Sequence, residues 1–161
     1  MSQDRKKNVK KINFSILGDI STKNTCLVFI HGWGGNKNSF KKVAGSFAIK
    51  NSVWFLPQAP YLLDEEDKYS WTFEKSPGKY ERKEPIQLML EFLEEQVFSR
   101  FESKDVFIFG FSQGALVCYE LLKTLDKPIA GLFPISGFLP RILFAKKGEL
   151  DGKFKANYYW S

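Results

Sequence analysis

Residues 106–116 read Val-Phe-Ile-Phe-Gly-Phe-Ser-Gln-Gly-Ala-Leu, and this stretch decides the fold. The apolar run 106–109 predicts a strand that is buried on both faces, which is typical of a parallel sheet. The helix-forming residues 115–125 follow after a turn that carries Ser112. A strand, a tight turn with a serine at its apex and a helix form a nucleophile elbow, which presents a serine hydroxyl for covalent catalysis.

Two glycines flank this serine, and we assign them a steric role. An elbow residue has a strained backbone, and strand and helix pass so close that side chains at Gly110 and Gly114 would collide. The turn also places Ser112 at the first turn of a helix, where backbone N–H groups favour negative charge. The alternative is an ordinary Gly-Ser turn. The strand before it and the helix after it favour the elbow.

The composition is that of a single globular domain. Of the 161 residues, 43% are apolar, 16% aromatic and 26% charged, which is enough for a packed core over residues 1–161. The net charge is +6, but five basic residues lie between Arg5 and Lys11, ahead of the first predicted strand. We interpret residues 1–11 as a flexible basic N-terminus. No basic stripe interleaved with aromatic residues follows, so we expect no nucleic-acid partner.

The sequence gives no sign of export or of a resident metal. Residues 1–10 lack the apolar segment of a signal peptide, and no apolar run approaches membrane-spanning length. Cys26 and Cys118 fall in a predicted core strand and a predicted core helix, where free buried thiols are the default. We therefore expect a cytoplasmic protein with no stable membrane insertion, no metal and no cofactor.

Further strands alternate with helices along the chain. Apolar and polar side chains alternate over residues 12–16, which predicts a half-exposed edge strand. A continuous apolar run predicts a strand at 26–30, the next buried strand is expected at 52–56, and another strand is expected at 129–135. This order predicts an α/β protein with an open, mostly parallel sheet and helices on both faces.

Helical patterns fill two of the intervals between these strands. One helix is expected to bury the apolar face Phe40, Val43, Ala44 and Phe47 and to be capped by Asn36, Asn38 or Ser39. A second begins near Pro85 and has the apolar stripe Ile86, Met89, Leu90, Leu93 and Val97. Residues 61–84 between them are polar and irregular, and we expect an excursion over the edge of the sheet.

A second chemical motif, His31-Gly32-Trp33-Gly34-Gly35, follows the predicted strand 26–30. Acyl transfer through a serine needs donors that point at the oxyanion of the tetrahedral intermediate. In an elbow fold one donor is the N–H after the nucleophile, here that of Gln113. The other comes from the loop after an earlier strand, and Trp33 is the candidate. A plain turn before a helix is the alternative role for the two glycines that end the motif.

Five motifs appear in the order found in one known family: residues 31–35, Pro57-Gln58-Ala59-Pro60, Trp71 with Phe73, residues 110–114, and Ser136-Gly137-Phe138-Leu139-Pro140. On these motifs the chain resembles the phospholipase/carboxylesterase family of α/β-hydrolases, which includes the acyl-protein thioesterases. The resemblance covers roughly residues 12–161. It implies an α/β-hydrolase fold and hydrolysis of carboxylic esters or thioesters through an acyl-serine intermediate.

The resemblance also implies roles for individual residues. Ser112 matches the family's nucleophile, and Trp33 and Gln113 match its oxyanion-hole positions. Trp71 and Leu139 match regions that border the acyl pocket. The expected ligand is therefore a small-molecule acyl ester or thioester.

The sequence departs from the family at the catalytic base. A hydrolytic serine needs a histidine oriented by a carboxylate, in the chain order Ser, Asp, His. The only histidine, His31, precedes Ser112 and belongs to the glycine-rich motif, where the family uses it structurally. The aromatic run 157–160 is typical of a further strand, after which the family supplies its acid and base. We therefore expect a hydrolase domain cut off before its last strands, or alternatively a short protein without a triad.

This expectation has two consequences. Activity of this chain alone is expected to be impaired, and the unfinished sheet edge is expected to favour self-association. The competing interpretation is a non-catalytic binding module, or pseudo-hydrolase, that keeps the pocket without a triad. A nucleic-acid or membrane binder with a basic surface is a third, more distant one.

Overall fold

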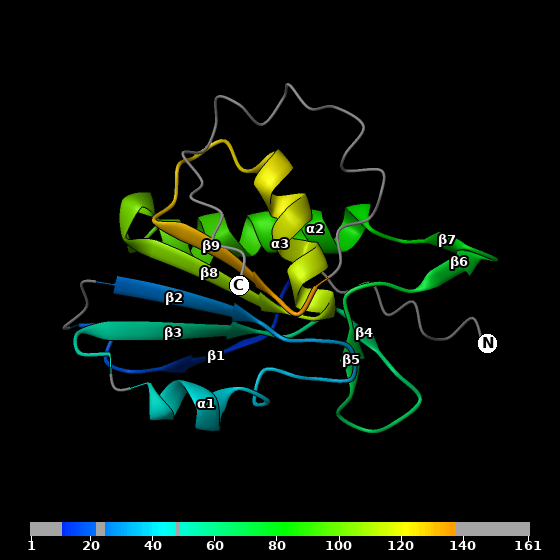
Figure 1. The fold of residues 1–161 in the computed structure, drawn as a ribbon, viewed down its shortest axis with the longest axis horizontal. Coiled ribbons are helices and arrows are strands. Elements are labelled where there is room, and N and C mark those ends of the chain that lie inside the picture. Colours follow the sequence, from blue (N-terminus) through cyan, green and yellow to red (C-terminus); the bar gives the residue numbers. More distant parts are fainter. Residues whose placement is uncertain (1–10, 22–24, 48, 138–161) are drawn as a thin grey trace.

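The computed structural model describes residues 11–21, 25–47 and 49–137, and they are built on one central sheet (Figure 1). Its five strands have the spatial order β1-β3-β2-β8-β9. They are β1 (Phe14–Leu17), β2 (Thr25–Ile30), β3 (Ser52–Pro57), β8 (Val106–Phe111) and β9 (Gly131–Ile135). β1 pairs antiparallel with β3, and every other pair in this sheet is parallel. The mostly parallel sheet predicted from the sequence is confirmed.

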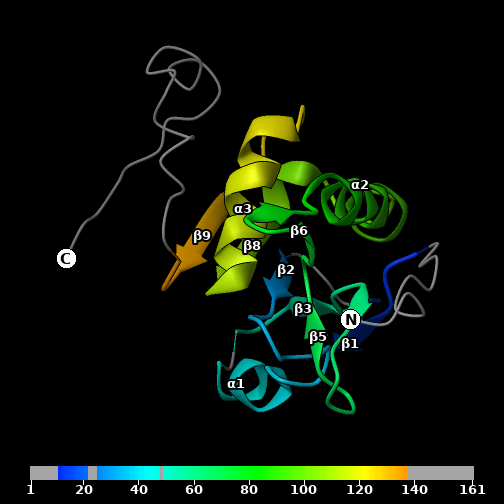
Figure 2. The same cartoon turned by 90° about the vertical axis from the view of Figure 1, so that its right-hand side faces the viewer.

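Helices cover both faces of this sheet, as Figure 2 shows. The short helix α1 (Lys41–Ser46) lies on one face. On the other face lie α2 (Lys83–Phe92), which continues as the π-helical turn η2 (Leu93–Phe98), and α3 (Gln113–Thr124). A 3₁₀ turn, η3 (Ser103–Asp105), leads into β8. No helix in these described ranges is long and apolar enough to cross a membrane.

The two faces of the sheet are buried to different extents. Under α2 and α3, strand residues such as Val28, Phe55 and Ile108 are fully buried with the helix residues Met89 and Leu93. The predicted apolar stripe of α2 faces this core because helical spacing puts its residues on one side.

On the opposite face of the sheet, one prediction about burial is wrong. We expected residues 106–109 to be buried on both faces, but Phe107 and Phe109 are only half-buried. In the described residues this face is covered by α1 alone, and α1 has six residues. Aromatic stacking replaces helix packing here: the rings of Phe109 and Phe133 lie 4.8 Å apart.

Two further predictions around α1 and β1 are wrong in detail. Only Ala44 of α1 is buried, and Val43 and Phe47 are 42% and 57% exposed, because so short a helix presents one turn to the sheet. The residue that precedes α1 is Phe40, and no side chain caps the helix. In the strand β1 the expected alternation fails at Ile16, which is 41% exposed.

The residues predicted to cap α1 stabilise the preceding turn instead. Asn36 donates its N–H to Ser39 Oγ at 2.8 Å, and its Oδ1 accepts from the Asn38 N–H at 2.7 Å. Such local side-chain bonds compete with capping.

Residues 61–84, predicted to be irregular, form two small hairpins. β4 (Tyr61–Leu62) pairs with β5 (Tyr69–Ser70), and β6 (Glu74–Ser76) pairs with β7 (Lys79–Tyr80). The strands are too short for any periodic pattern to show in the sequence. A β-bridge between Gly35 and Tyr69 attaches the first hairpin to the loop after β2.

The steric role assigned to the two elbow glycines is confirmed. A Cβ atom on Gly110 would lie 2.2 Å from the carbonyl oxygen of Gly114. A Cβ atom on Gly114 would lie 2.2 Å from the carbonyl oxygen of Ile30. Both contacts are with backbone, which cannot move aside as a flexible side chain can. β2, β8 and α3 therefore meet at a distance that only glycine permits.

We predict that Gly114→Ala lowers the free energy of unfolding by about 3 kcal/mol, because the added methyl group has to separate α3 from β2. Gly45→Ala is the matched control. Its Cβ atom would meet nothing within 4 Å, so alanine in this exposed helical position is expected to stabilise by about 0.5–1 kcal/mol. Urea unfolding measures both. Equal shifts in the two variants would contradict the close approach.

Candidate active site

Ser112 lies at the apex of the turn between β8 and α3, and its side chain is exposed. Its backbone has φ 52° and ψ −111°, a strained conformation for a residue with a Cβ atom. The Ser112 N–H donates to the Ile135 carbonyl at 2.9 Å, which fixes the turn to the end of β9. The hydroxyl makes no capping hydrogen bond to α3, although Ser112 precedes its first residue. The turn therefore holds an exposed hydroxyl at the N-terminus of a helix.

The glycine-rich loop after β2 lies directly against this turn. A Cβ atom on Gly32 would be 3.3 Å from Ser112 Cβ and 3.3 Å from the Phe111 carbonyl oxygen. The loop is held from its other side by β5, since Gly34 N–H donates to the Tyr69 carbonyl at 2.9 Å. Gly34 has φ +74°, which glycine adopts without strain. The backbone of the loop, rather than a side chain, thus approaches the serine.

The two N–H groups expected to form an oxyanion hole come from these two segments. Gln113 is the first residue of α3, and Trp33 lies in the loop with its side chain 65% exposed. Within the described part of the chain, neither N–H donates to a backbone carbonyl. The assignment of these two N–H groups to an oxyanion hole stays a prediction.

His31 is held in the interior by both of its ring nitrogens. It is 1% exposed. Its Nδ1 lies 2.7 Å from the Gly32 carbonyl oxygen, and its Nε2 accepts the Ala59 N–H at 3.0 Å. Burial lowers the pKa of the ring, and the Gly32 carbonyl opposes this only in part. A neutral ring that donates from Nδ1 and accepts at Nε2 satisfies both contacts, so His31 positions the loop and has no free nitrogen for Ser112.

The Gln113 side chain connects the elbow to the residues after β5. Its Oε1 accepts the Trp71 N–H at 2.9 Å, and its Nε2 donates to Ser70 Oγ at 3.0 Å. Trp71 Nε1 in turn donates to the His31 carbonyl at 2.9 Å. Sequence analysis missed Ser70, because only the tertiary contact with Gln113 distinguishes it from other serines.

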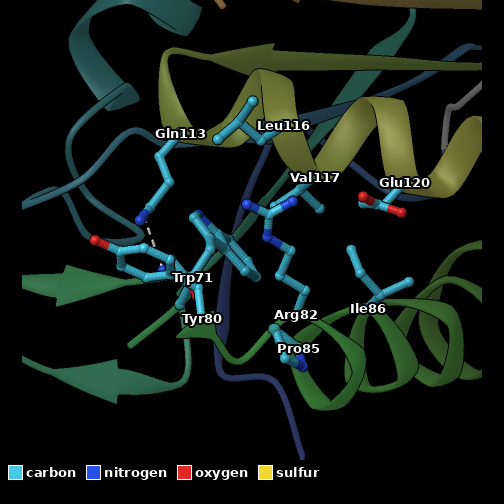
Figure 3. Close-up of a pocket in the computed structure, with 10 residues that line it drawn as sticks. Trp71, Tyr80, Arg82, Pro85, Ile86, Gln113, Leu116, Val117 and Glu120 are labelled. Carbon is cyan, nitrogen blue, oxygen red and sulfur yellow. Dashed lines mark hydrogen bonds between the residues drawn. The ribbon is translucent and has the colours of Figure 1, made fainter. Parts of the chain in front are cut away.

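A cavity of about 370 Å³ lies beside this network, between the start of α2, the end of β7 and α3 (Figure 3). Trp71 and Gln113 both line it, and Ser112 does not. Trp71, expected beside the acyl pocket, is itself 2% exposed and contacts the cavity from inside the fold. Leu139, the other residue expected there, lies outside the described residues.

The sequence matches the model of the family "Phospholipase/Carboxylesterase" over residues 13–148. The chain belongs to the phospholipase/carboxylesterase family. It is 25% identical over 141 residues to acyl-protein thioesterase 1 of Schizosaccharomyces pombe, a match that covers 81% of the chain and 63% of that protein.

Solved structures agree on the α/β-hydrolase-like fold. The family member described here matches esterase PE8 with a TM-score of 0.64 and 20% identity, over 80% of this chain and 65% of that one. It matches Arabidopsis thaliana SOBER1 L63A with a TM-score of 0.59 and 18% identity, over 72% of this chain and 62% of that one. The chain thus spans slightly less than two thirds of the length of these relatives.

The buried imidazole predicts a pH dependence of stability. Because the pKa of His31 is lowered by folding from about 6.5, the unfolded chain binds a proton below that pH that the folded chain excludes. We predict that the free energy of unfolding falls as the pH drops from 6.5 towards 5.5, by at most about 1.4 kcal/mol per pH unit.

His31→Gln is the control, since it keeps hydrogen-bonding groups but does not titrate, and the chain has no other histidine. Urea unfolding at several pH values is expected to show that the free energy of unfolding depends on pH between 5.5 and 6.5 in the original chain and does not in the variant. Equal slopes would show that folding does not lower the pKa of His31.

Proposed function

We propose that this chain is a serine hydrolase of carboxylic esters or thioesters and that Ser112 is its nucleophile. The observation that carries this proposal is the approach of the Gly32 backbone to Ser112, with 3.3 Å between a Gly32 Cβ position and Ser112 Cβ. A glycine-rich loop so close to an exposed hydroxyl supports the proposal that its backbone N–H groups serve an oxyanion hole. Membership of the phospholipase/carboxylesterase family supports the reaction class.

In the proposed reaction, Ser112 Oγ attacks the carbonyl carbon and gives up its proton to a base. The N–H groups of Trp33 and Gln113 stabilise the oxyanion that forms, because fixed dipoles need no reorganisation as the charge develops. The bond to the alcohol or thiol then breaks, and the leaving group takes a proton. Water hydrolyses the acyl-serine in a second step of the same kind. Trp71 and Leu139 are proposed to border the acyl group.

A binding module without turnover is the second candidate, and a specific observation favours it. The chain contains one histidine, and both of its ring nitrogens are engaged at 2.7 and 3.0 Å. This chain thus offers Ser112 no imidazole as a base. In serine proteases, loss of triad members leaves a rate about 10³–10⁴-fold above water, supplied by the oxyanion hole and by binding. We therefore expect slow turnover by this chain alone.

Labelling with a fluorophosphonate distinguishes the two candidates, because the reagent needs an activated serine. We predict covalent labelling, slow because no imidazole in this chain serves as the base, that Ser112→Ala abolishes and that Ser99→Ala leaves intact; Ser99 is exposed and bonded to the Glu95 carbonyl of its own helical turn. Mass spectrometry locates the adduct. A folded chain that stays unlabelled would favour the binding module. Fast turnover of a p-nitrophenyl ester, lost in Ser112→Ala, would show that a base is present after all.

The cysteines support a proposed location in the cytoplasm. Cys26 and Cys118 are both buried, as expected from the sequence, and form no disulfide within the described residues; burial raises the pKa of the Cys118 thiol. Cysteines that form no disulfide are the usual state in a reducing compartment.

Self-association through the sheet edge is also proposed. Among the described residues β9 has a strand neighbour on one side only, and its Phe133 and Ile135 are 45% and 40% exposed. We predict concentration-dependent dimers in sedimentation velocity that Phe133→Lys weakens. Ile16→Lys, at a similarly exposed position of the opposite edge strand, is the control and should not weaken them. A monomer at every concentration would contradict this proposal.

A further inference from the structure

The hydroxyl of Ser70 has a full set of hydrogen-bond partners. Ser70 is the last residue of β5 and is 2% exposed. Its Oγ donates to the Thr72 carbonyl at 2.6 Å. The same oxygen accepts Gln113 Nε2–H at 3.0 Å and the Thr72 N–H at 3.3 Å. Since a hydroxyl has one hydrogen and two lone pairs, these three bonds use its whole capacity.

These bonds decide which way the Gln113 amide points. Because the hydrogen of the Ser70 hydroxyl is engaged with the Thr72 carbonyl, the oxygen accepts from Gln113, and Nε2 has to face it. The other end of the amide, Oε1, then accepts the Trp71 N–H at 2.9 Å. The contact from Ser70 Oγ to Oε1 is longer, at 3.3 Å. In a reversed amide Nε2 would meet the Trp71 N–H, donor against donor. Ser70 and Trp71 thus hold both ends of the amide.

The orientation of this amide bears on the elbow because Gln113 directly follows Ser112. Gln113 is the first residue of α3, and its N–H belongs to the peptide that joins the two residues. A side chain held at both ends restricts the rotation of the backbone that carries it. On its other side the turn is held by the bond from the Ser112 N–H to the Ile135 carbonyl.

The neighbours of Ser70 in the chain hold the glycine-rich loop. The Tyr69 N–H donates to the Gly35 carbonyl at 3.0 Å. Trp71 Nε1 donates to the His31 carbonyl at 2.9 Å. Three consecutive residues, with Ser70 in the middle, therefore bond both to the loop after β2 and to the start of α3.

We propose that Ser70 is a positioning residue of the elbow. Through the Gln113 amide it sets the position of the Ser112–Gln113 peptide relative to the glycine-rich loop. This role rests on the proposed function, in which backbone N–H groups of these two segments stabilise an oxyanion. Ser70 acts on the elbow through its bond to Gln113. Displacement of such donors by about 1 Å costs a factor of about 100 in rate, so a small change in the amide is enough to be measured.

The rate at which a fluorophosphonate labels Ser112 is the first test, on variants of the 161-residue chain that urea unfolding shows to be folded. We expect Ser70→Ala to slow labelling about tenfold, because the amide loses one of its two anchors. Ser52→Ala is the matched control and should label as the original chain does. It also removes a serine Oγ that donates to a backbone carbonyl, that of Ile49 at 2.8 Å, but at the start of β3, at the opposite end of the sheet.

A double variant shows whether Ser70 acts through Gln113. Gln113→Met keeps the length of the side chain but makes neither bond, and we expect it to slow labelling at least tenfold. Ser70→Ala introduced into Gln113→Met should then cause no further loss. Additive losses would show that Ser70 acts independently of Gln113 and would overturn the proposal.

The second test does not depend on catalysis. We expect ¹⁵N order parameters of the Ser112 and Gln113 amides near about 0.85 in the original chain, falling towards about 0.6 in Ser70→Ala and unchanged in Ser52→Ala. A serine with a merely structural role would lower the urea midpoint and leave these order parameters as they are. That result would also overturn the proposal.

The two tests separate this proposal from the proposed function. An original chain that is not labelled, with lower order parameters in Ser70→Ala, would refute Ser112 as an activated nucleophile and support the role of Ser70. Labelling at equal rates in the original chain and in Ser70→Ala would refute the role of Ser70 and support the nucleophile.

Discussion

The contact on which the site depends is the one between α3 and β2 at Gly114. With 2.2 Å between a Gly114 Cβ position and the Ile30 carbonyl oxygen, no side chain fits between helix and strand. This contact brings the end of β2 beside the end of β8, so the loop that follows Ile30 reaches Ser112. Any residue larger than glycine at this position would move the loop away from Ser112. Contacts between backbone atoms thus fix the geometry of the elbow, and side chains only stabilise it.

Buried hydrogen bonds then fix the loop and the turn relative to each other. His31 accepts the Ala59 N–H, Trp71 donates to the His31 carbonyl, and Gln113 accepts the Trp71 N–H. These three bonds connect segments that follow β2, β3, β5 and β8. Since a buried polar group without a partner costs about 1–3 kcal/mol, the network favours one arrangement of all four segments. A preorganised arrangement is what an oxyanion hole requires.

The same helix contributes to two different environments. At its N-terminus α3 carries Gln113 beside Ser112, where the donors are backbone N–H groups. One to two turns further, its side chains Leu116, Val117 and Glu120 line the cavity that Arg82 enters. Gln113 belongs to both, because it directly follows Ser112 and its side chain bonds to Trp71 in the cavity lining. The fold thus separates the proposed reacting centre from this cavity by a single turn of helix.

The elbow, the parallel strands and the burial of the two cysteines could be predicted from the sequence, because each depends on local sterics or on apolar periodicity within one segment. Gly110 and Gly114 indicate that two backbone segments pass close to each other, although the sequence does not say which segments these are. Tertiary contacts alone set how far Phe109 is buried, where residues 61–84 form hairpins and how closely Arg82 approaches α3. These features arise where segments distant in sequence come together, and how much a side chain is buried there depends on what lies opposite it. A single sequence contains no periodic signal for such encounters.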